Sequence, residues 1–127
     1  IPANKELYAY AEQKWTIREI LQHLIDTERI FCYRALRIAR NDKTNLPGFD
    51  ENDFARYGKA NKRTLQQLIE EFKTVRHATL SLFKSFDAED YTKTGMASNS
   101  EITVRAIGFI LAGHMIHHER IIKERYL

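Results

Sequence analysis

The chain has 127 residues, of which 43% are hydrophobic and 29% charged, with two prolines and five glycines; this is typical of one globular domain over residues 1–127 and excludes a disordered chain. No apolar run approaches the roughly 18 residues that span a bilayer, and the N-terminus lacks the basic and apolar segments of a signal peptide, so we expect no membrane and a cytoplasmic location. The net charge of +3 does not indicate nucleic acid binding, because Lys and Arg are interspersed with Asp and Glu and form no basic block.

The first half of the chain predicts a long helix, a loop and a short helix. Thr16 and Glu19 have the spacing of a capping box, and apolar residues at helical spacing follow to about Arg40. The segment NDKTNLPG then reads as a loop. Asp50 is placed to cap a short helix that ends near Tyr57.

The second half predicts two further long helices. Thr64 and Gln67 repeat the capping pattern, so a helix should run from 65 to about 85, and Asp87 caps one more turn. The segment TKTGMASNS is rich in turn-forming residues and should be exposed. The last helix should run from 103 to 125. No alternating segment of useful length supports a strand.

Three long helices make an incomplete bundle, because each apolar stripe needs partners on both sides and the common closed solution has four helices. The opening residues IPANKELYAY are typical of the end of a preceding helix. We therefore expect that a first helix is missing from this chain, or that another chain supplies the contact, as a homodimer would.

Two histidines of the last helix should point into the core. His114 and His118 are four residues apart and share the face of Val104, Ile107 and Leu111, on which Met115 is also expected. Two imidazoles on an apolar face are costly unless their nitrogens are satisfied, at about 1–3 kcal/mol for each unpaired group. A metal ion removes that cost. Since Cys32 is the only cysteine, such a site must use histidines and carboxylates.

The first long helix offers a third histidine in QHLIDTE, where His23 flanks the apolar stripe and Glu28 lies at its centre. A buried carboxylate needs a cation, a metal or strong donors. Glu28 could orient a metal-bound histidine by accepting a hydrogen bond from its free ring N–H. Alternatively it pairs with Arg34 or Arg105 and has a structural role.

The segments QHLIDTERIFCYRALRIARNDKTNLPGFDENDF and VRAIGFILAGHMIHHERIIKERYL resemble the DinB/YfiT-like family of metal-dependent enzymes. The resemblance implies an all-α, up-down-down-up four-helix bundle, whose first helix is absent here. It also implies one divalent transition metal, typically nickel or zinc, on His23, His114 and His118. Relatives include transferases and isomerases that use a low-molecular-weight thiol.

The expected function is a metal-dependent enzyme, a hydrolase or a thiol-dependent transferase, acting on a small-molecule substrate. Three histidines leave a coordination position open, as in catalytic zinc sites. Asp50 and Glu51 of LPGFDE could line the mouth and move a proton, or merely cap the short helix. Among the aromatic residues, Trp15, Tyr33, Phe49, Phe54 and Tyr57 either shape a pocket or pack in the core.

Two other hypotheses stay open. One is a non-catalytic helical binding module that the metal stabilises. The other is a helix-turn-helix regulator, prompted by TIREILQHL, which requires measurable DNA affinity at low salt.

Overall fold

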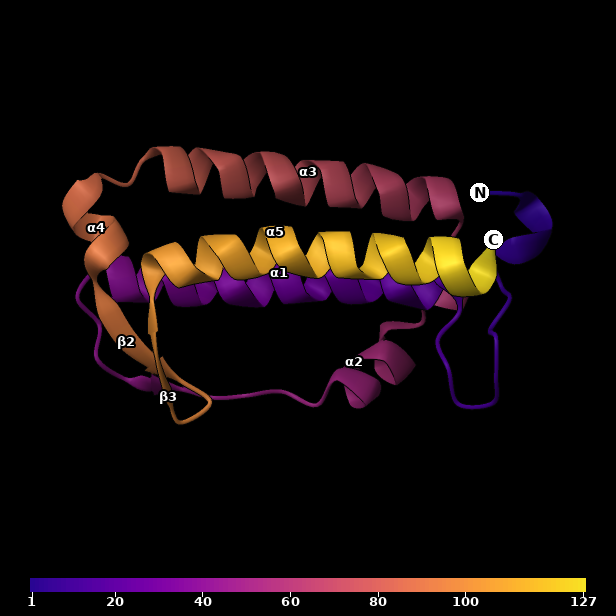
Figure 1. The fold of residues 1–127 in the computed structure, drawn as a ribbon, viewed down its shortest axis with the longest axis horizontal. Helices are drawn as coiled ribbons and strands as arrows, with labels where there is room; N and C mark the ends of the chain where they lie inside the picture. Colours follow the sequence, from indigo (N-terminus) through magenta and orange to yellow (C-terminus); the bar gives the residue numbers. More distant parts are fainter.

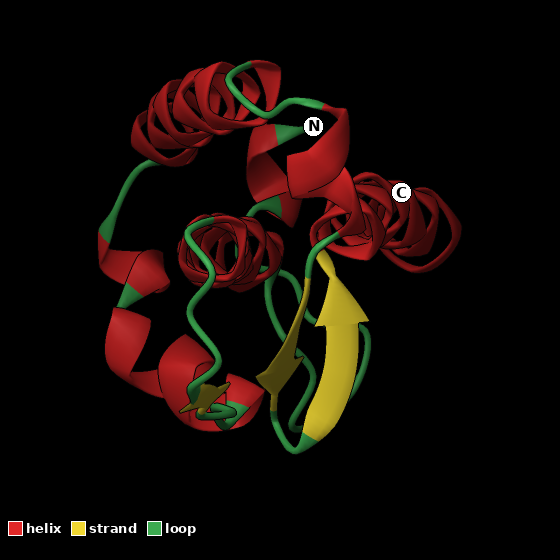
Figure 2. Cartoon of the chain, turned by 90° about the vertical axis from the view of Figure 1, so that its left-hand side faces the viewer, coloured by secondary structure: helices red, strands yellow, loops and turns green.

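The computed structural model describes residues 1–127 and shows a predominantly helical chain with three long helices, α1 (Ile17–Ala39), α3 (Leu65–Lys84) and α5 (Val104–Ile121). Helix α1 lies between the other two and packs against both, as the view along the helices shows (Figure 2). Helices α1 and α3 run in the same direction and α5 runs in the opposite one (Figure 1). These are the directions that an up-down-down-up bundle has in its last three helices.

The helix starts follow the predicted capping residues. The Thr16 hydroxyl accepts from the Glu19 amide at 3.1 Å, while the Glu19 carboxylate accepts from the Thr16 amide at 2.8 Å. Thr64 and Gln67 form the same reciprocal pair at α3. The remaining helical segments are α2 (Glu51–Gly58, capped by Asp50), α4 (Ala88–Thr92, capped by Asp87), single 3-10 turns at Ala3–Lys5 and Ala60–Lys62, and a π-helical turn at Ile122–Tyr126.

The segment TIREILQHL does not form a helix-turn-helix. After the capping residue Thr16 it belongs to one unbroken helix of 23 residues, and its apolar residues are used in the core, where Ile17 and Ile20 pack with Tyr126. The hypothesis of a helix-turn-helix regulator is therefore wrong at this segment. The residues before α1 contain no long helix, and a first helix preceding this chain stays a prediction.

The prediction that no strand occurs is wrong. Three short strands, β1 (Asn45–Leu46), β2 (Thr94–Ala97) and β3 (Ser100–Thr103), form a sheet in the order β1-β2-β3, with β1 parallel and β3 antiparallel to β2. Ser98 and Asn99 join β2 to β3 with φ of 50° and 64°, the left-handed backbone that tight hairpins use. The segment TKTGMASNS is thus a hairpin beside α1 rather than an exposed turn.

One face of α5 is buried and the opposite face is exposed. Val104, Ile107 and Leu111 belong to the largest buried cluster, together with residues of α1. Met115, expected on the same face, is 36% exposed because it lies at the edge of the buried stripe. The exposed face carries the large apolar side chains of Phe109 and Ile116, while Ile110 lies between the two faces and is 40% exposed. No helix combines the length and apolar character needed to cross a membrane.

Candidate metal centre

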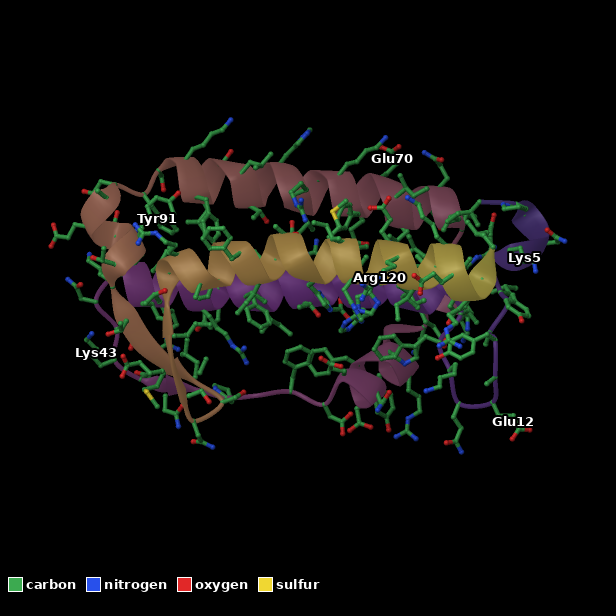
Figure 3. All side chains as sticks on the ribbon, in the orientation of Figure 1. Lys5, Glu12, Lys43, Glu70, Tyr91 and Arg120 are labelled. Carbon is green, nitrogen blue, oxygen red and sulfur yellow. The ribbon has the colours of Figure 1, made fainter.

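Three histidines from two helices meet at one point. His23 comes from α1, and His114 and His118 come from successive turns of α5. The Nε2 atom of His114 lies 2.9 Å from Nε2 of His23 and 3.0 Å from Nε2 of His118. The cluster lies toward the end of α5 that carries Arg120, which is labelled in Figure 3. The structure therefore brings together the three residues that the sequence predicts as ligands.

Hydrogen bonding alone does not account for this arrangement. Each imidazole nitrogen has one in-plane position, which holds either a proton or a lone pair. Nε2 of His114 therefore cannot form a linear hydrogen bond with both of its neighbours. Three lone pairs directed at a common cation would satisfy all three nitrogens, and ligands at 2.0–2.1 Å in a tetrahedral site are about 3.4 Å apart. The observed separations need only a small expansion to reach that value.

Burial keeps the three imidazoles in the form that binds metals. Desolvation and the neighbouring histidines lower the pKa of His23 to about 3 and that of His118 to about 4. Burial also lowers the pKa of His114, against an opposing effect of the Glu51 carboxylate. All three rings are thus neutral near pH 7, and neutral imidazole is the ligating form.

The groups around the histidines fix some of the ring orientations. His23 is 4% exposed, and its Nδ1 atom lies 3.4 Å from the Thr27 hydroxyl, one helical turn along α1. The Trp15 ring packs against His23 with 4.6 Å between ring centroids, and it stacks on His118 at 6.4 Å. The Tyr126 hydroxyl donates to the Trp15 carbonyl and so ties this segment to the π-helical turn. Nδ1 of His118 is buried without a hydrogen-bond partner.

Glu28 has a different partner from the predicted ones. Its carboxylate, 2% exposed, accepts hydrogen bonds from Arg76 at 2.7–3.1 Å and from the Thr79 hydroxyl at 2.8 Å. The prediction of Arg34 or Arg105 as its partner is wrong. No hydrogen bond joins Glu28 to a histidine, because its side chain points toward α3 whereas His23 points toward α5. Glu28 therefore links α1 to α3.

The two acids of the loop before α2 have different positions. The Asp50 carboxylate accepts from the amides of Asn52 and Asp53 and caps α2, as the structural alternative predicted. Glu51 is exposed and lines a cavity of about 260 Å³ beside His118. The other lining residues include Lys14, Trp15 and Tyr126. The cavity gives a small molecule access to His118, one of the three histidines.

Thr27 and Lys14 are among the residues of this site that sequence reasoning missed. Thr27 follows His23 by four residues, so it lies on the same helix face, and that spacing is the signal that could have found it. Lys14 gave no signal, because the segment before α1 has no periodicity that would fix its direction. Only the folded path of residues 10–15 brings it to the cavity.

Comparison with known proteins gives a family and a fold. The family model described as the DinB superfamily matches residues 1–122. Among solved structures, the chain is similar to YfiT from Bacillus subtilis, described as a probable metal-dependent hydrolase with an unusual four-helix bundle topology. The TM-score is 0.74 at 12% identity, and the match covers 97% of this chain and 74% of that one. A search of curated proteins finds no match.

Proposed function

Because the chain belongs to the DinB superfamily, we propose that it is a metal-dependent enzyme in which His23, His114 and His118 hold one divalent transition-metal ion. The observation that carries this proposal is the convergence of three neutral imidazole Nε2 atoms beside an open cavity. Nickel and zinc are the ions we propose first, since both accept three imidazole ligands. The description of YfiT as a probable metal-dependent hydrolase agrees with this proposal.

The chain's own residues have defined tasks in this scheme. A divalent ion at the histidines supplies a Lewis acid that lowers the pKa of a water or thiol beside it. Trp15 covers His23 and His118 and limits the access of bulk water. Glu51 lies at the cavity wall, where it can accept the proton that a water or thiol gives up. Thr27 holds the ring of His23 by accepting from its Nδ1–H.

The reaction we propose is hydrolysis or transfer of a low-molecular-weight thiol to a small electrophile. The cavity of about 260 Å³ beside His118 suits a small-molecule substrate. The two reactions are separable by experiment with the zinc- or nickel-loaded protein. A hydrolase turns over 4-nitrophenyl esters in the absence of thiol, whereas a transferase consumes 1-chloro-2,4-dinitrobenzene only when a thiol such as cysteine is present.

The metal assignment is tested by His114→Ala. Loss of one of three ligands should remove most of the bound metal, which elemental analysis of the loaded and desalted protein measures. His117→Ala is the matched control, because His117 is the adjacent histidine of the same helix but is exposed and outside the cluster. Equal metal content in the parent and in H114A would refute the assignment.

The second candidate is a non-catalytic, metal-stabilised binding module, favoured by the exposed apolar face of α5. Phe109 is 73% exposed and Ile116 is 65% exposed, and large apolar side chains grouped on one face mark interaction surfaces. We propose that a second copy of this chain covers that face, which gives a homodimer. An exchangeable water on the ion would favour catalysis over this module.

A further inference from the structure

Arg34 of α1 is a buried cation without a carboxylate partner. Arg34 is 6% exposed, and its guanidinium forms no ion pair with any Asp or Glu of the chain. Its one hydrogen bond is donated from a terminal guanidinium nitrogen to the Pro47 carbonyl at 2.9 Å. Buried charges are ordinarily paired, and burial lowers the pKa of this guanidinium. The position is therefore costly in the absence of an anion.

The packing around Arg34 leaves part of the guanidinium free for a ligand. Its plane lies over the Phe31 ring, 4.8 Å from the ring centroid, so one face is covered by an apolar group. A guanidinium has five N–H donors, and Pro47 accepts from one nitrogen only. The other guanidinium nitrogens form no hydrogen bond within the chain. They are not fully buried either, because the one fully buried side-chain nitrogen or oxygen that lacks a hydrogen-bond partner is Nδ1 of His118. Arg34 instead lines a cavity.

This cavity has apolar walls and is distinct from the one at the histidines. Its volume is about 350 Å³, and Ile30, Leu46, Phe49 and Phe54 line it. The rings of Phe49 and Phe54 contact each other with 5.0 Å between centroids. Arg34 follows His23 by eleven residues, or three turns, which places it about 16 Å farther along the same face of α1.

A second cation at this cavity already has a carboxylate partner. Arg29 also lines it, but Arg29 pairs at 2.5 Å with Glu71, a carboxylate that it shares with Arg63, and its side chain is 55% exposed. Arg34 is therefore the cation of this cavity that lacks a counter-charge. The site therefore combines one cation that lacks a carboxylate partner with mostly apolar walls.

We propose that this cavity binds a small organic anion with an apolar body, with its carboxylate or equivalent group on Arg34 and its body between Phe49, Phe54 and Leu46. A carboxylate accepts from the planar fork of a guanidinium through two parallel hydrogen bonds. The aromatic and aliphatic walls bury the apolar part of the ligand. This site does not depend on the metal proposal, since none of its lining residues is a histidine.

The test compares octanoate with octanamide, which has the same chain length and no charge, by calorimetric titration of the metal-loaded full chain. Octanoate should bind at least about tenfold more tightly, because a hydrogen bond to a charged group is worth more than one to a neutral group. Arg34→Gln should abolish that preference. Arg29→Gln is the matched control and should keep it, because Arg29 is largely exposed and already has a carboxylate partner in Glu71.

Three results would overturn the proposal. They are equal affinity for the two ligands, unchanged octanoate binding in R34Q, and amide chemical shift changes confined to the neighbourhood of the three histidines, which would mean that octanoate binds the metal ion. Phe54→Ala keeps the test decisive if R34Q does not fold. Phe54→Ala should weaken the binding of octanoate and of octanamide by a similar factor and leave the preference for octanoate unchanged, since Phe54 supplies apolar surface and no charge.

Discussion

At the residue scale, Thr27 is the group that orients His23, and its removal should weaken metal binding. Thr27→Val deletes the hydroxyl 3.4 Å from Nδ1 of His23 and leaves a side chain of similar volume. Loss of such a supporting hydrogen bond typically costs 10–100-fold in metal affinity. Competition of the loaded protein with a chelator measures the change. Thr27→Ser retains the hydroxyl and should bind the metal as tightly as the parent does. Equal metal affinity of T27V and the parent would contradict the role of Thr27 in orienting His23.

Residues on one helix could be predicted from the sequence, whereas pairs between helices could not. Helical periodicity alone puts His114 and His118 on the face of α5 that turns inward, and their spacing indicates a common ligand. The partner of Glu28 depends on how α1 is aligned with α3, 48 residues further on at Arg76. No local pattern encodes that alignment, so Arg34 and Arg105 were equally reasonable on sequence grounds. For the same reason, the position of Arg34 at a cavity could not be predicted.

At the scale of elements, the small sheet was not predicted because the buried positions of its central strand, β2, are small residues. The buried residues of β2 are Gly95 and Ala97, which give almost no hydrophobic alternation. The hairpin residues Ser98 and Asn99 adopt positive φ without the Asn-Gly or Asp-Gly pair that usually marks such a turn. The helices were predictable because capping residues such as Thr16 and Thr64 stand directly before segments whose apolar residues recur at helical spacing.

Gly95 fixes the distance between β2 and α1, and we expect Gly95→Ala to destabilise the fold. A Cβ atom at this position would lie 2.5 Å from Cγ1 of Ile38, a side chain that is 1% exposed and cannot move aside. Overpacking of this kind costs about 1–3 kcal/mol. Urea denaturation monitored by circular dichroism measures the free energy of unfolding.

The control for this prediction is Gly113→Ala in α5. A Cβ atom there meets nothing within 4 Å, and alanine is favoured over glycine inside a helix by about 0.5–1 kcal/mol. The two substitutions add the same methyl group and should shift the free energy of unfolding in opposite directions. A neutral G95A would show that β2 can move away from α1.

At the scale of the whole molecule, the exposed face of α5 predicts self-association. Because α1 lies between α3 and α5 (Figure 2), α5 has a partner on one side and presents Phe109 and Ile116 on the other. Light scattering should give a mass about twice the 14.9 kDa of the chain. The double variant F109E/I116E should give the monomer mass, since a dimer would bury four carboxylates. A monomeric parent would contradict the homodimer.

Metal binding should also stabilise the whole molecule, because the ligands belong to two helices that have no covalent link nearby. The imidazoles converge only when α1 and α5 are packed together, so the ion binds the folded chain far better than the unfolded one. At a free metal concentration about 100 times the dissociation constant, this adds about 2.7 kcal/mol. For a domain of this size, that raises the melting temperature by about 10 °C.

Thermal melting with zinc and with excess chelator measures this difference. The parent should lose about 10 °C on chelation, whereas H114A, which lacks one ligand, should show almost no difference between the two conditions. Only the difference within each variant counts, so any intrinsic effect of the substitution on stability cancels. If chelation removes the metal from the parent and leaves its melting temperature unchanged, the ion does not bridge α1 and α5, and His23 is not one of its ligands.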